Sequence, residues 1–275
     1  MSAPDGIKQY TVRATPEAQE AGAVALAVAS LPESFGPAAS DNQADVQVIS
    51  GQPGWTARAA EAIASGARGV VVVNPAAENT ESLQANAQQS GAAVVLDQCW
   101  ASNPALPGAE DTVRSMAGRA ALLDTVATAP TGTDPGELFA DHFATVVRLT
   151  GPLASLRLLT RGPRGYTATA VLTNGAPVAL QGVVSNARPA ALDFRLLTDD
   201  GGVSVTLPEP VAAWPATVKV TGPQGELLLP TIYESAHRAT WRRLKEHLDA
   251  GTSPSDLHRF AVLSDSISAL TQTHR

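Results

Sequence analysis

The chain has 275 residues, of which 44% are hydrophobic and 16% are charged, and its formal net charge is −7. This composition is typical of a globular protein with one large domain or two ordinary ones, and it excludes a disordered chain. The acidic balance argues against nucleic acid as a partner, because phosphate contacts need clustered Lys and Arg. Lysine is scarce, with only Lys8, Lys219 and Lys245.

Cysteine usage and hydropathy indicate a cytoplasmic protein. Cys99 is the single cysteine, so no internal disulfide can form, which fits a reducing compartment. Residues 1–20 are polar and lack the basic start and apolar run of a signal peptide. The longest apolar run, Ala21 to Leu31, is shorter than the roughly 20 residues that span a bilayer. We therefore expect a cytoplasmic protein with no membrane partner.

The first 97 residues predict a parallel α/β sheet. Gln9–Arg13 is a candidate strand, Pro16–Ala21 a turn or helix start, and Val24–Ala29 a candidate second strand. Strands and helices then alternate, in the order strand Val46–Ser50, turn Gly51–Gly54, helix Thr56–Ser65, strand Gly69–Val73, helix to Gln89 after a cap at Asn79 or Thr80, and strand Ala92–Leu96. This order is that of a βαβαβ unit, half of a doubly wound sheet.

The remainder of the chain changes to β-rich character. Two helices are predicted first, at Asp111–Thr125 and Glu137–Leu149. Short strands follow, separated by Gly-containing turns, at Ser155–Thr160, Tyr166–Leu172, Val178–Ser185, Leu192–Leu197, Val203–Leu207, Thr217–Val220 and Glu226–Leu229. Helices at Glu234–Ala250 and Ser255–Thr273 end the chain.

These elements predict two domains of different class. Residues 1–130 form an α/β domain with a truncated, Rossmann-like parallel sheet. Residues 131–275 form an α+β domain with an open mixed or antiparallel sheet and helices. We expect the C-terminal helices to pack back on the first domain.

Several segments resemble one dehydrogenase family in their order and spacing. Ala44–Ser50 is similar to the family's D-V-V-V-I-A-T-P strand, and Ala67–Pro75 lies where the family has G-K-H-V-L-x-E-K-P. Gln98–Ala105 resembles Q-N-x-R-F-N-P, and Thr173–Val178 resembles F-x-N-G-A. From residue 45 to residue 275 the chain therefore resembles the glucose–fructose oxidoreductase/inositol dehydrogenase (Gfo/Idh/MocA) family, as a shortened and degenerate member.

The resemblance implies a Rossmann domain that holds NAD or NADP, and a sheet domain that binds a sugar or other polyol. It also implies hydride transfer between the nicotinamide and a carbon of that substrate. Because the family's open sheet commonly packs against a second copy, the resemblance implies a homodimer or larger through the C-terminal sheet, and a carbohydrate-like small molecule as ligand.

Two departures weaken the expectation of hydride transfer. A dinucleotide fingerprint needs G-x-G-x-x-G after the first strand, where its glycines allow a tight turn and close approach of the pyrophosphate. No G-x-G occurs anywhere in the chain, and the segment before Asp45 is too short for two full βα units. The lysine of E-K-P matches Asn74, whose amide hydrogen-bonds but is not an acid or base near neutral pH.

A third family motif, an Asp and a His four residues apart, matches the stretch from Glu137 to His142 in two ways. Without a gap, Asp141 takes the His position; with a gap of one residue, His142 takes it. The other histidines, His237, His247, His258 and His274, are interpreted as solvated residues of the terminal helices. No metal site is expected, since no pair has convincing ligand spacing.

The candidate site residues belong to a rebuilt active site. In it Asp141 or His142 would act as acid or base, with Asn74 orienting the substrate. Gly51, Gln52 and Pro53, together with Asn74, would contact the cofactor, and the resemblance places Trp100 and Asn103 at the substrate.

Three functions follow from these observations. The first is a non-catalytic, ligand-binding or regulatory subunit that has lost NAD(P)-dependent hydride transfer and needs no cofactor. The second is an NAD(P)-dependent oxidoreductase of a sugar or polyol that uses the rebuilt site. The third is a purely structural role through the open sheet. The loss of both the fingerprint and the lysine favours the first.

Overall fold

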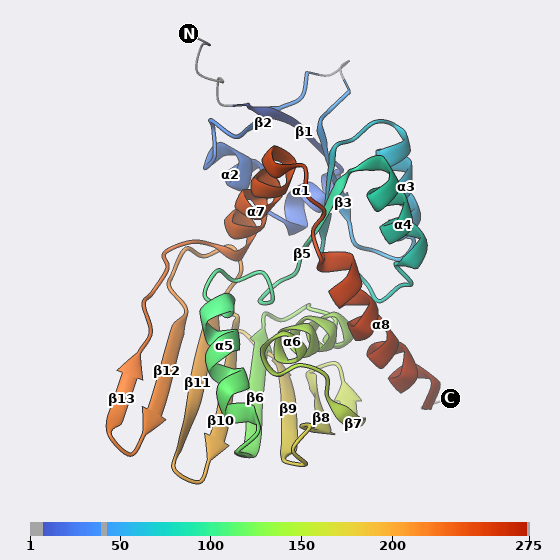
Figure 1. The fold of residues 1–275 in the computed structure, drawn as a ribbon. Coiled ribbons are helices and arrows are strands. Elements are labelled where there is room, and N and C mark those ends of the chain that lie inside the picture. Colours follow the sequence, from blue (N-terminus) through green and yellow to red (C-terminus); the bar gives the residue numbers. More distant parts are fainter. Residues whose placement is uncertain (1–7, 40–42, 274–275) are drawn as a thin grey trace. The chain divides into compact units, whose positions relative to one another are not determined.

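The computed structural model describes residues 8–39 and 43–273, which fold into two compact units (Figure 1). The first unit contains residues 8–39 and 43–98 together with His237–Ala261. The second contains Cys99–Ala236 together with residues 262–273. Each unit has its own β-sheet and its own hydrophobic core.

The first unit is built on a parallel sheet of five strands in the order β2-β1-β3-β4-β5. The strands are β1 Tyr10–Ala14, β2 Phe35–Pro37, β3 Val46–Ser50, β4 Gly69–Val73 and β5 Ala93–Asp97. Every residue of β4 and β5 is buried, as expected for a parallel sheet with helices on both faces. From β1 the chain goes first to β2 on one side and then to β3 on the other side of β1. The direction in which strands are added therefore reverses between β1 and β3.

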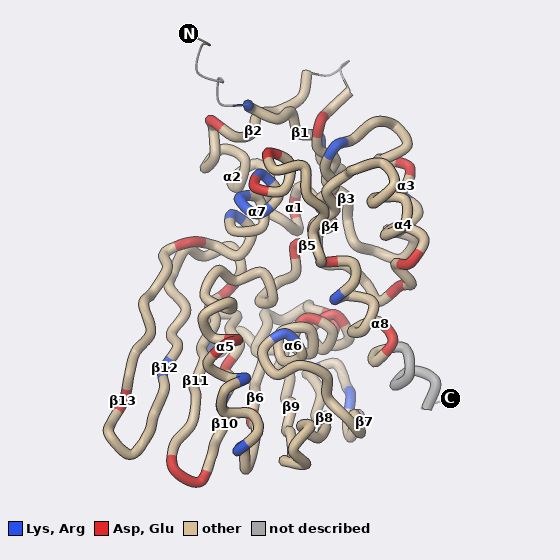
Figure 2. Tube along the Cα trace, in the orientation of Figure 1, with Lys and Arg blue, Asp and Glu red and all other residues tan. Residues whose placement is uncertain are grey.

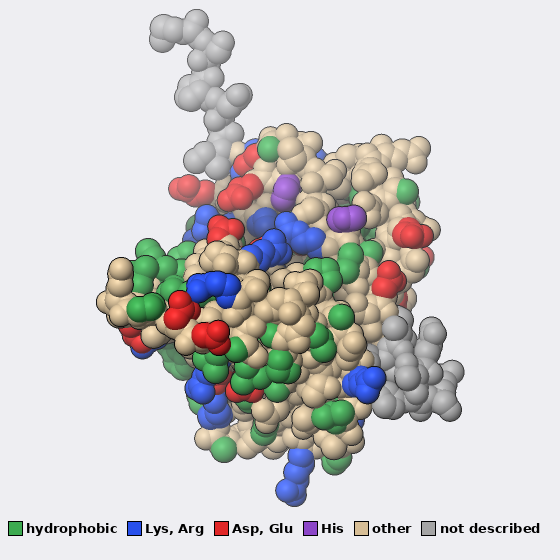
Figure 3. Space-filling view, turned by 60° about the horizontal axis from the view of Figure 1, so that its bottom comes forward, with side chains coloured by type: hydrophobic (Ala, Val, Ile, Leu, Met, Phe, Trp, Pro, Cys, Tyr) green, Lys and Arg blue, Asp and Glu red, His purple; other side chains and the backbone are tan. Residues whose placement is uncertain are grey.

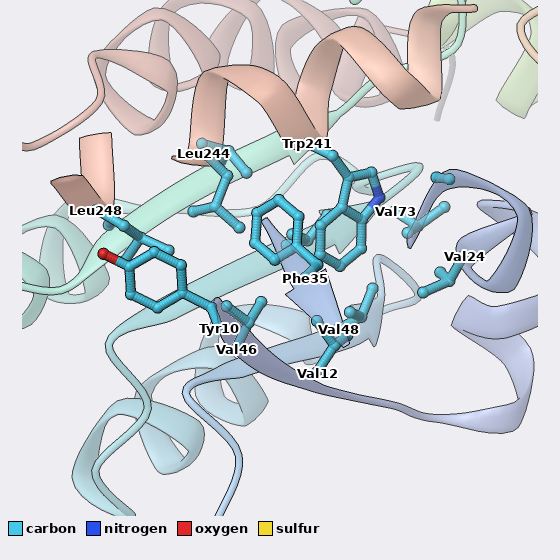
Figure 4. Close-up of a cluster of buried hydrophobic side chains, with 14 of the residues drawn as sticks. Tyr10, Val12, Val24, Phe35, Val46, Val48, Val73, Trp241, Leu244 and Leu248 are labelled. Carbon is cyan, nitrogen blue, oxygen red and sulfur yellow. The ribbon is translucent and has the colours of Figure 1, made fainter. Parts of the chain in front are cut away.

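Helices from both ends of the chain cover this sheet. They are α1 Pro16–Ala21, α2 Val24–Ala29, α3 Trp55–Ala64, α4 Glu81–Ser90, α7 Ala236–Ala250 and the start of α8 Asp256–Thr273. On one face Trp241, Leu244 and Leu248 of α7 enter the same core as Tyr10 and Phe35 (Figure 4). The Trp241 and Phe35 rings meet edge to face with centroids 4.9 Å apart. The C-terminal helix α7 therefore completes the core of the N-terminal sheet.

The second unit is built on a mixed sheet of eight strands in the order β13-β12-β11-β10-β6-β9-β8-β7. The strands are β6 Ala120–Ala129, β7 Ala154–Gly162, β8 Gly165–Val171, β9 Pro177–Val184, β10 Ala191–Thr198, β11 Gly201–Pro208, β12 Thr217–Gly222 and β13 Gly225–Leu228. Only β6 and β9 pair in parallel. Helices α5 Leu106–Ala117 and α6 Pro135–Thr150 pack on one face of this sheet (Figure 1).

The fold class predicted from the sequence is confirmed, with two local corrections. Val24–Ala29 is helix α2 rather than a strand, and the second strand is β2. Val24 and Ala27 are buried while Leu26 is exposed, the three-residue spacing of a helix face. The helix predicted at Asp111–Thr125 ends at Ala117, and Ala120–Ala129 is strand β6, in the middle of the second sheet.

Because Ala120–Ala129 is strand β6 of the second sheet, the second unit begins earlier than the sequence predicted. The sequence placed a domain boundary at residue 130, but β6 pairs with β9 and β10, so it belongs to the second sheet. The second unit accordingly begins at Cys99. The chain returns to the first unit at His237, which is the second residue of α7.

Candidate functional site

The carboxyl edge of the first sheet is the candidate site, because ligands of parallel α/β sheets bind beyond the carboxyl ends of the strands. Backbone hydrogen bonds join the ends of three neighbouring strands there. Gly51 N–H donates to Val73 O at 2.7 Å, and Gly51 O accepts from Ala76 N–H at 2.7 Å. Asn74 N–H donates to Asp97 O at 3.0 Å. The residues that follow β3, β4 and β5 are therefore held side by side.

Two predicted site residues, Gly51 and Asn74, meet at this edge. A Cβ on Gly51 would overlap the backbone of Asn74 and Pro75, so only glycine fits. Asn74 adopts the left-handed conformation, with φ of 51°, which Asn tolerates better than most residues. Its side chain is exposed at the end of β4. The amide therefore lies where a ligand of the sheet edge would meet it.

The other predicted cofactor contacts, Gln52 and Pro53, lie in a turn that is folded around Arg58. The Arg58 guanidinium donates to Ser50 O at 3.1 Å, to Gln52 O at 2.6 Å and to Pro53 O at 3.0 Å. Three carbonyl groups of this turn are thus already hydrogen-bonded within the unit. The predicted contact of this turn with a cofactor remains a prediction.

A buried carboxylate–imidazole pair lies at the same edge. Asp97 is the last residue of β5, and its side chain is only 1% exposed. It accepts a hydrogen bond from His237 Nδ1 at 2.7 Å and one from Thr240 Oγ1 at 3.1 Å. His237 and Thr240 are three residues apart on α7, so both side chains leave one face of that helix.

The electrostatics of this pair shift the pKa of His237. Burial alone lowers the pKa of His237, but the negative charge of Asp97 and its hydrogen bond outweigh that effect. The pKa of His237 is consequently raised above its ordinary value of 6.5. A protonated ring would form a buried ion pair with Asp97.

The sequence interpretation missed this pair, since it treated His237 as a solvated residue. One signal was present: Asp97 ends an otherwise apolar strand, and a buried carboxylate needs a hydrogen-bonding partner. The sequence did not reveal the partner, because His237 lies 140 positions further along the chain.

The connection from β1 to α1 does not fit the pyrophosphate of NAD(P). β1 ends at Ala14 and α1 begins at Pro16, so only Thr15 separates strand from helix. Thr15 N–H donates to Val48 O, and its hydroxyl accepts from Ala18 N–H, so the residue fastens the turn and caps the short helix. The fingerprint instead requires a glycine-lined turn that lets phosphate approach the backbone.

The first glycine after β1 serves packing rather than phosphate binding. Gly22 follows α1, and a Cβ there would come within 2.9 Å of the Val73 side chain. The helix that follows β3 is also occupied at its N-terminus. The Glu78 carboxylate accepts hydrogen bonds from Gly54 N–H and from the Thr56 hydroxyl. This carboxylate already takes the place that a phosphate would take at α3.

Another predicted site residue, His142, is a fully buried residue of the second unit. Its Nε2 lies 2.8 Å from Thr125 Oγ1, and its Nδ1 lies 2.6 Å from the Tyr166 hydroxyl. Because the Thr125 hydroxyl donates to Asp193 O, it accepts from Nε2, and Nδ1 must accept from Tyr166. Burial lowers the pKa of His142 to about 3, so the ring is neutral.

Neighbouring Asp141 is half-buried on α6, and its backbone oxygen accepts from the Thr145 hydroxyl. The pKa of Tyr166 is raised mainly by burial and, to a smaller extent, by the negative charge of Asp141. Both ring nitrogens of His142 are thus used inside the unit. The predicted acid or base role of Asp141 or His142 stays a prediction.

The predicted substrate contacts also lie in the second unit, between β5 and α5. Asn103 is buried, and its side-chain oxygen accepts from Ala105 N–H at 3.0 Å, so it supports the start of α5. The Trp100 indole is buried, and its N–H has no hydrogen-bond partner among the described residues. The predicted residues are therefore divided, with Gly51, Gln52, Pro53 and Asn74 in the first unit and Trp100, Asn103, Asp141 and His142 in the second.

Neither a metal centre nor a membrane span is found within residues 8–39 and 43–273. No group of three His, Cys, Asp or Glu side chains there is arranged to hold a metal ion. None of the helices in this part of the chain is long and apolar enough to cross a membrane.

On α7 the basic residues precede the acidic ones, and Arg242 pairs with Glu246 and Lys245 with Asp249 (Figure 2). His274 lies outside the described residues.

Comparison with known proteins gives the fold a clear precedent, although no family model and no curated protein matches the sequence. UDP-N-acetylglucosamine 3-dehydrogenase GnnA from Acidithiobacillus ferrooxidans is similar, with TM-score 0.68 and 14% identity over 96% of this chain and 97% of that chain. The dehydrogenase MviM from Clostridium difficile has TM-score 0.69 and 8% identity over 98% and 100% of the two chains.

A third similar structure is KijD10, a 3-ketoreductase from Actinomadura kijaniata in complex with NADP. It has TM-score 0.66 and 13% identity over 96% of this chain and 88% of that chain. The likeness spans both units in all three cases. The chain therefore has the two-domain fold of Gfo/Idh/MocA-type dehydrogenases, and the resemblance seen in the sequence is confirmed at the level of fold.

Proposed function

We propose that this chain binds a hydroxyl-rich small molecule, a sugar or polyol, at the carboxyl edge of its first sheet, without transferring hydride to or from NAD(P). One observation carries the proposal. The single residue between β1 and α1 leaves no glycine turn for the pyrophosphate. The chain would then act as a ligand-binding or regulatory subunit of the dehydrogenase fold.

The ligand class follows from the chemistry of the edge and from the similar structures. Asn74 presents an exposed amide with both a donor and an acceptor, a group that suits hydroxyl recognition. One similar structure is named a dehydrogenase of a sugar nucleotide. Asp97 and His237 add a polar pair one strand away, since Asn74 N–H bonds to Asp97 O.

A turnover assay combined with a binding assay tests this proposal. The purified full chain is incubated with NAD⁺ or NADP⁺ and a panel of sugars and polyols, and the absorbance of reduced nicotinamide is followed. We expect no turnover with any member of the panel. Ligand-observed NMR with the same panel should detect binding of at least one member. Reproducible turnover would refute the loss of hydride transfer, and absence of all binding would refute the ligand class.

The second candidate is an NAD(P)-dependent oxidoreductase of a sugar or polyol with a rebuilt active site. The comparisons favour this candidate more than the first, because the similar structures carry names of dehydrogenases or a ketoreductase and one contains NADP. Asp141 or His142 would then be acid or base, and Asn74 would orient the substrate. Gly51, Gln52 and Pro53 would contact the cofactor, and Trp100 and Asn103 the substrate.

Variants at α6 test the second candidate. These variants are measured if the turnover assay shows activity. If Asp141 is the acid or base, Asp141→Asn should reduce kcat by at least about a hundredfold. Asp111→Asn, the same change at an exposed carboxyl of α5 in the same unit, is the matched control and should leave kcat unchanged. An unchanged kcat in both variants would remove Asp141 from this role. His142→Gln gives the corresponding test of His142, with a thermal melt to separate lost activity from lost folding.

We also propose a homodimer or larger assembly through the second sheet. Leu197 and Val183 are exposed on β10 and β9, and Leu227 and Leu228 are exposed on the edge strand β13, with Leu227 61% exposed. Hydrophobic side chains gather over the β12–β13 hairpin in Figure 3, at the left of that view. Burying such a surface would favour association. Light scattering should give at least twice the monomer mass, and a concentration-independent monomer would contradict the proposal.

A further inference from the structure

The two ring nitrogens of His237 have different surroundings. Nδ1 donates to the Asp97 carboxylate at 2.7 Å. Nε2 has no hydrogen-bond partner among the described residues. It is also not among the unpartnered polar atoms that are fully shielded from solvent. Nε2 is therefore in contact with solvent, although the side chain as a whole is only 8% exposed.

The buried carboxylate fixes which nitrogen carries the proton in the neutral ring. An ionised carboxylate only accepts hydrogen bonds, so Nδ1 must donate and Nε2 keeps its lone pair. The Thr240 hydroxyl binds the other carboxylate oxygen at 3.1 Å, which restrains the carboxylate as well. In the neutral ring, Nε2 is consequently a hydrogen-bond acceptor of fixed orientation.

A purely structural role for the pair does not require a ring nitrogen that faces solvent. Removing an ion pair from water costs several kcal/mol per ion, so a buried pair is weak evidence for stability. A packing histidine is expected to satisfy both nitrogens inside the protein, as His142 does with Thr125 and Tyr166. His237 satisfies only one, and it does so at the edge of the sheet where α/β folds bind ligands.

We propose that His237 Nε2 accepts a hydrogen bond from a hydroxyl group of a sugar or polyol bound at the carboxyl edge of the first sheet, and that Asp97 is the positioning residue that keeps Nε2 unprotonated in the neutral ring. This assignment rests on the proposed binding of such a ligand and names the residue that receives it. Thr240 restrains Asp97 through its hydroxyl.

Nitrogen NMR of the full chain, labelled with ¹⁵N at histidine and titrated with myo-inositol and glucose as probes, tests the assignment. At a pH where the ring is neutral, His237 should show the Nδ1–H form. Addition of a binding probe should then shift its Nε2 resonance in a saturable way. His247 and His258 supply internal controls, because their signals should not move.

Three variants separate positioning from packing. Asp97→Asn can donate from its side-chain amide, so the proton should move to Nε2 and probe affinity should fall about tenfold or more. Thr240→Val keeps side-chain volume and leaves the Asp97–His237 bond in place, so the Nδ1–H form should persist. His237→Gln removes the acceptor nitrogen and should also weaken binding at least about tenfold. Thermal melts establish that each variant is folded.

The possible results are distinguishable. Probe binding seen by saturation transfer, with no shift at His237, would overturn the assignment and leave the proposed function standing. No binding of any sugar or polyol would overturn both. A neutral His237 with its proton on Nε2 in the unaltered chain would overturn the positioning role of Asp97, whatever the probes do.

Discussion

His142 in the second unit and His237 in the first are both buried, and their partners differ in charge. His142 lies between two hydroxyl groups, Thr125 and Tyr166, and its pKa is lowered to about 3. His237 faces the carboxylate of Asp97, and its pKa is raised above 6.5. Burial acts in the same direction on both rings, so the partner decides which protonation state the fold prefers.

The two histidines consequently give stability opposite dependences on pH. A lowered pKa means that the unfolded chain takes up the proton first, so the contribution of His142 is lost as pH falls from 6.5 toward 3. A raised pKa means that the folded chain holds the proton longer. The contribution of His237 is complete below 6.5 and is lost as pH rises through its folded pKa.

The largest expected effect comes from removing the packed ring. His142→Ala leaves a cavity and takes away the acceptor of the buried Tyr166 hydroxyl. We expect a loss of about 3–5 kcal/mol in the free energy of unfolding, measured by urea denaturation. His247→Ala, at a half-exposed position of α7, is the control and should cost under about 1 kcal/mol. A loss under about 1 kcal/mol for His142→Ala would contradict its packing role.

The pH dependence sharpens the comparison at the same residue. His142→Gln removes the titrating group and keeps a polar side chain of similar length. Between pH 7 and pH 5 the unaltered chain should lose about 2 kcal/mol more stability than this variant. Urea denaturation at the two pH values gives the difference. Equal losses in the two proteins would mean that His142 is not kept neutral by the fold.

The corresponding change in the first unit is smaller. Asp97→Asn removes the charge that holds the proton on His237, so only burial remains and the pKa of His237 should fall below its value in the unaltered chain. Stability near pH 6 should decrease by about 1–3 kcal/mol, because a charge-assisted hydrogen bond is lost. Histidine NMR titration measures the pKa. A pKa that does not move would show that Asp97 does not govern His237.

The smallest expected effect concerns the helix after β3. Glu78→Gln removes the negative charge at the N-terminus of α3 and retains a hydrogen-bond acceptor. We expect a loss of about 0.5–1 kcal/mol, measured by urea denaturation. Glu81→Gln, in the first turn of α4, is a matched exposed control. A stabilised Glu78→Gln variant would contradict the capping role.

Local sequence patterns were sufficient to predict the central part of the first sheet. Four consecutive valines identify β4, and α4 ends at Ser90, one residue beyond the predicted end at Gln89. Strand β6 was missed, because its alanines and leucines follow a helix and continue a helical composition. Its strand conformation depends on pairing with β9 and β10, which come much later in the chain.

The site was harder to predict for the same reason. Gly51 and Asn74 were found because each directly follows a recognisable strand. The Asp97–His237 pair joins β5 to a helix 140 residues away, and no local pattern connects them. The burial of His142 likewise depends on Thr125 from β6 and Tyr166 from β8. Contacts between distant segments decide what these ionisable groups do, and one sequence does not specify them.

Calorimetric titration of the full chain with NADH and NADPH tests most directly the central claim, that the first unit does not hold a dinucleotide. With Thr15 alone between β1 and α1, and Glu78 at the N-terminus of α3, we predict no saturable heat at roughly millimolar cofactor. Binding with a dissociation constant of about 1 μM, some 8 kcal/mol, would contradict the account and favour the oxidoreductase.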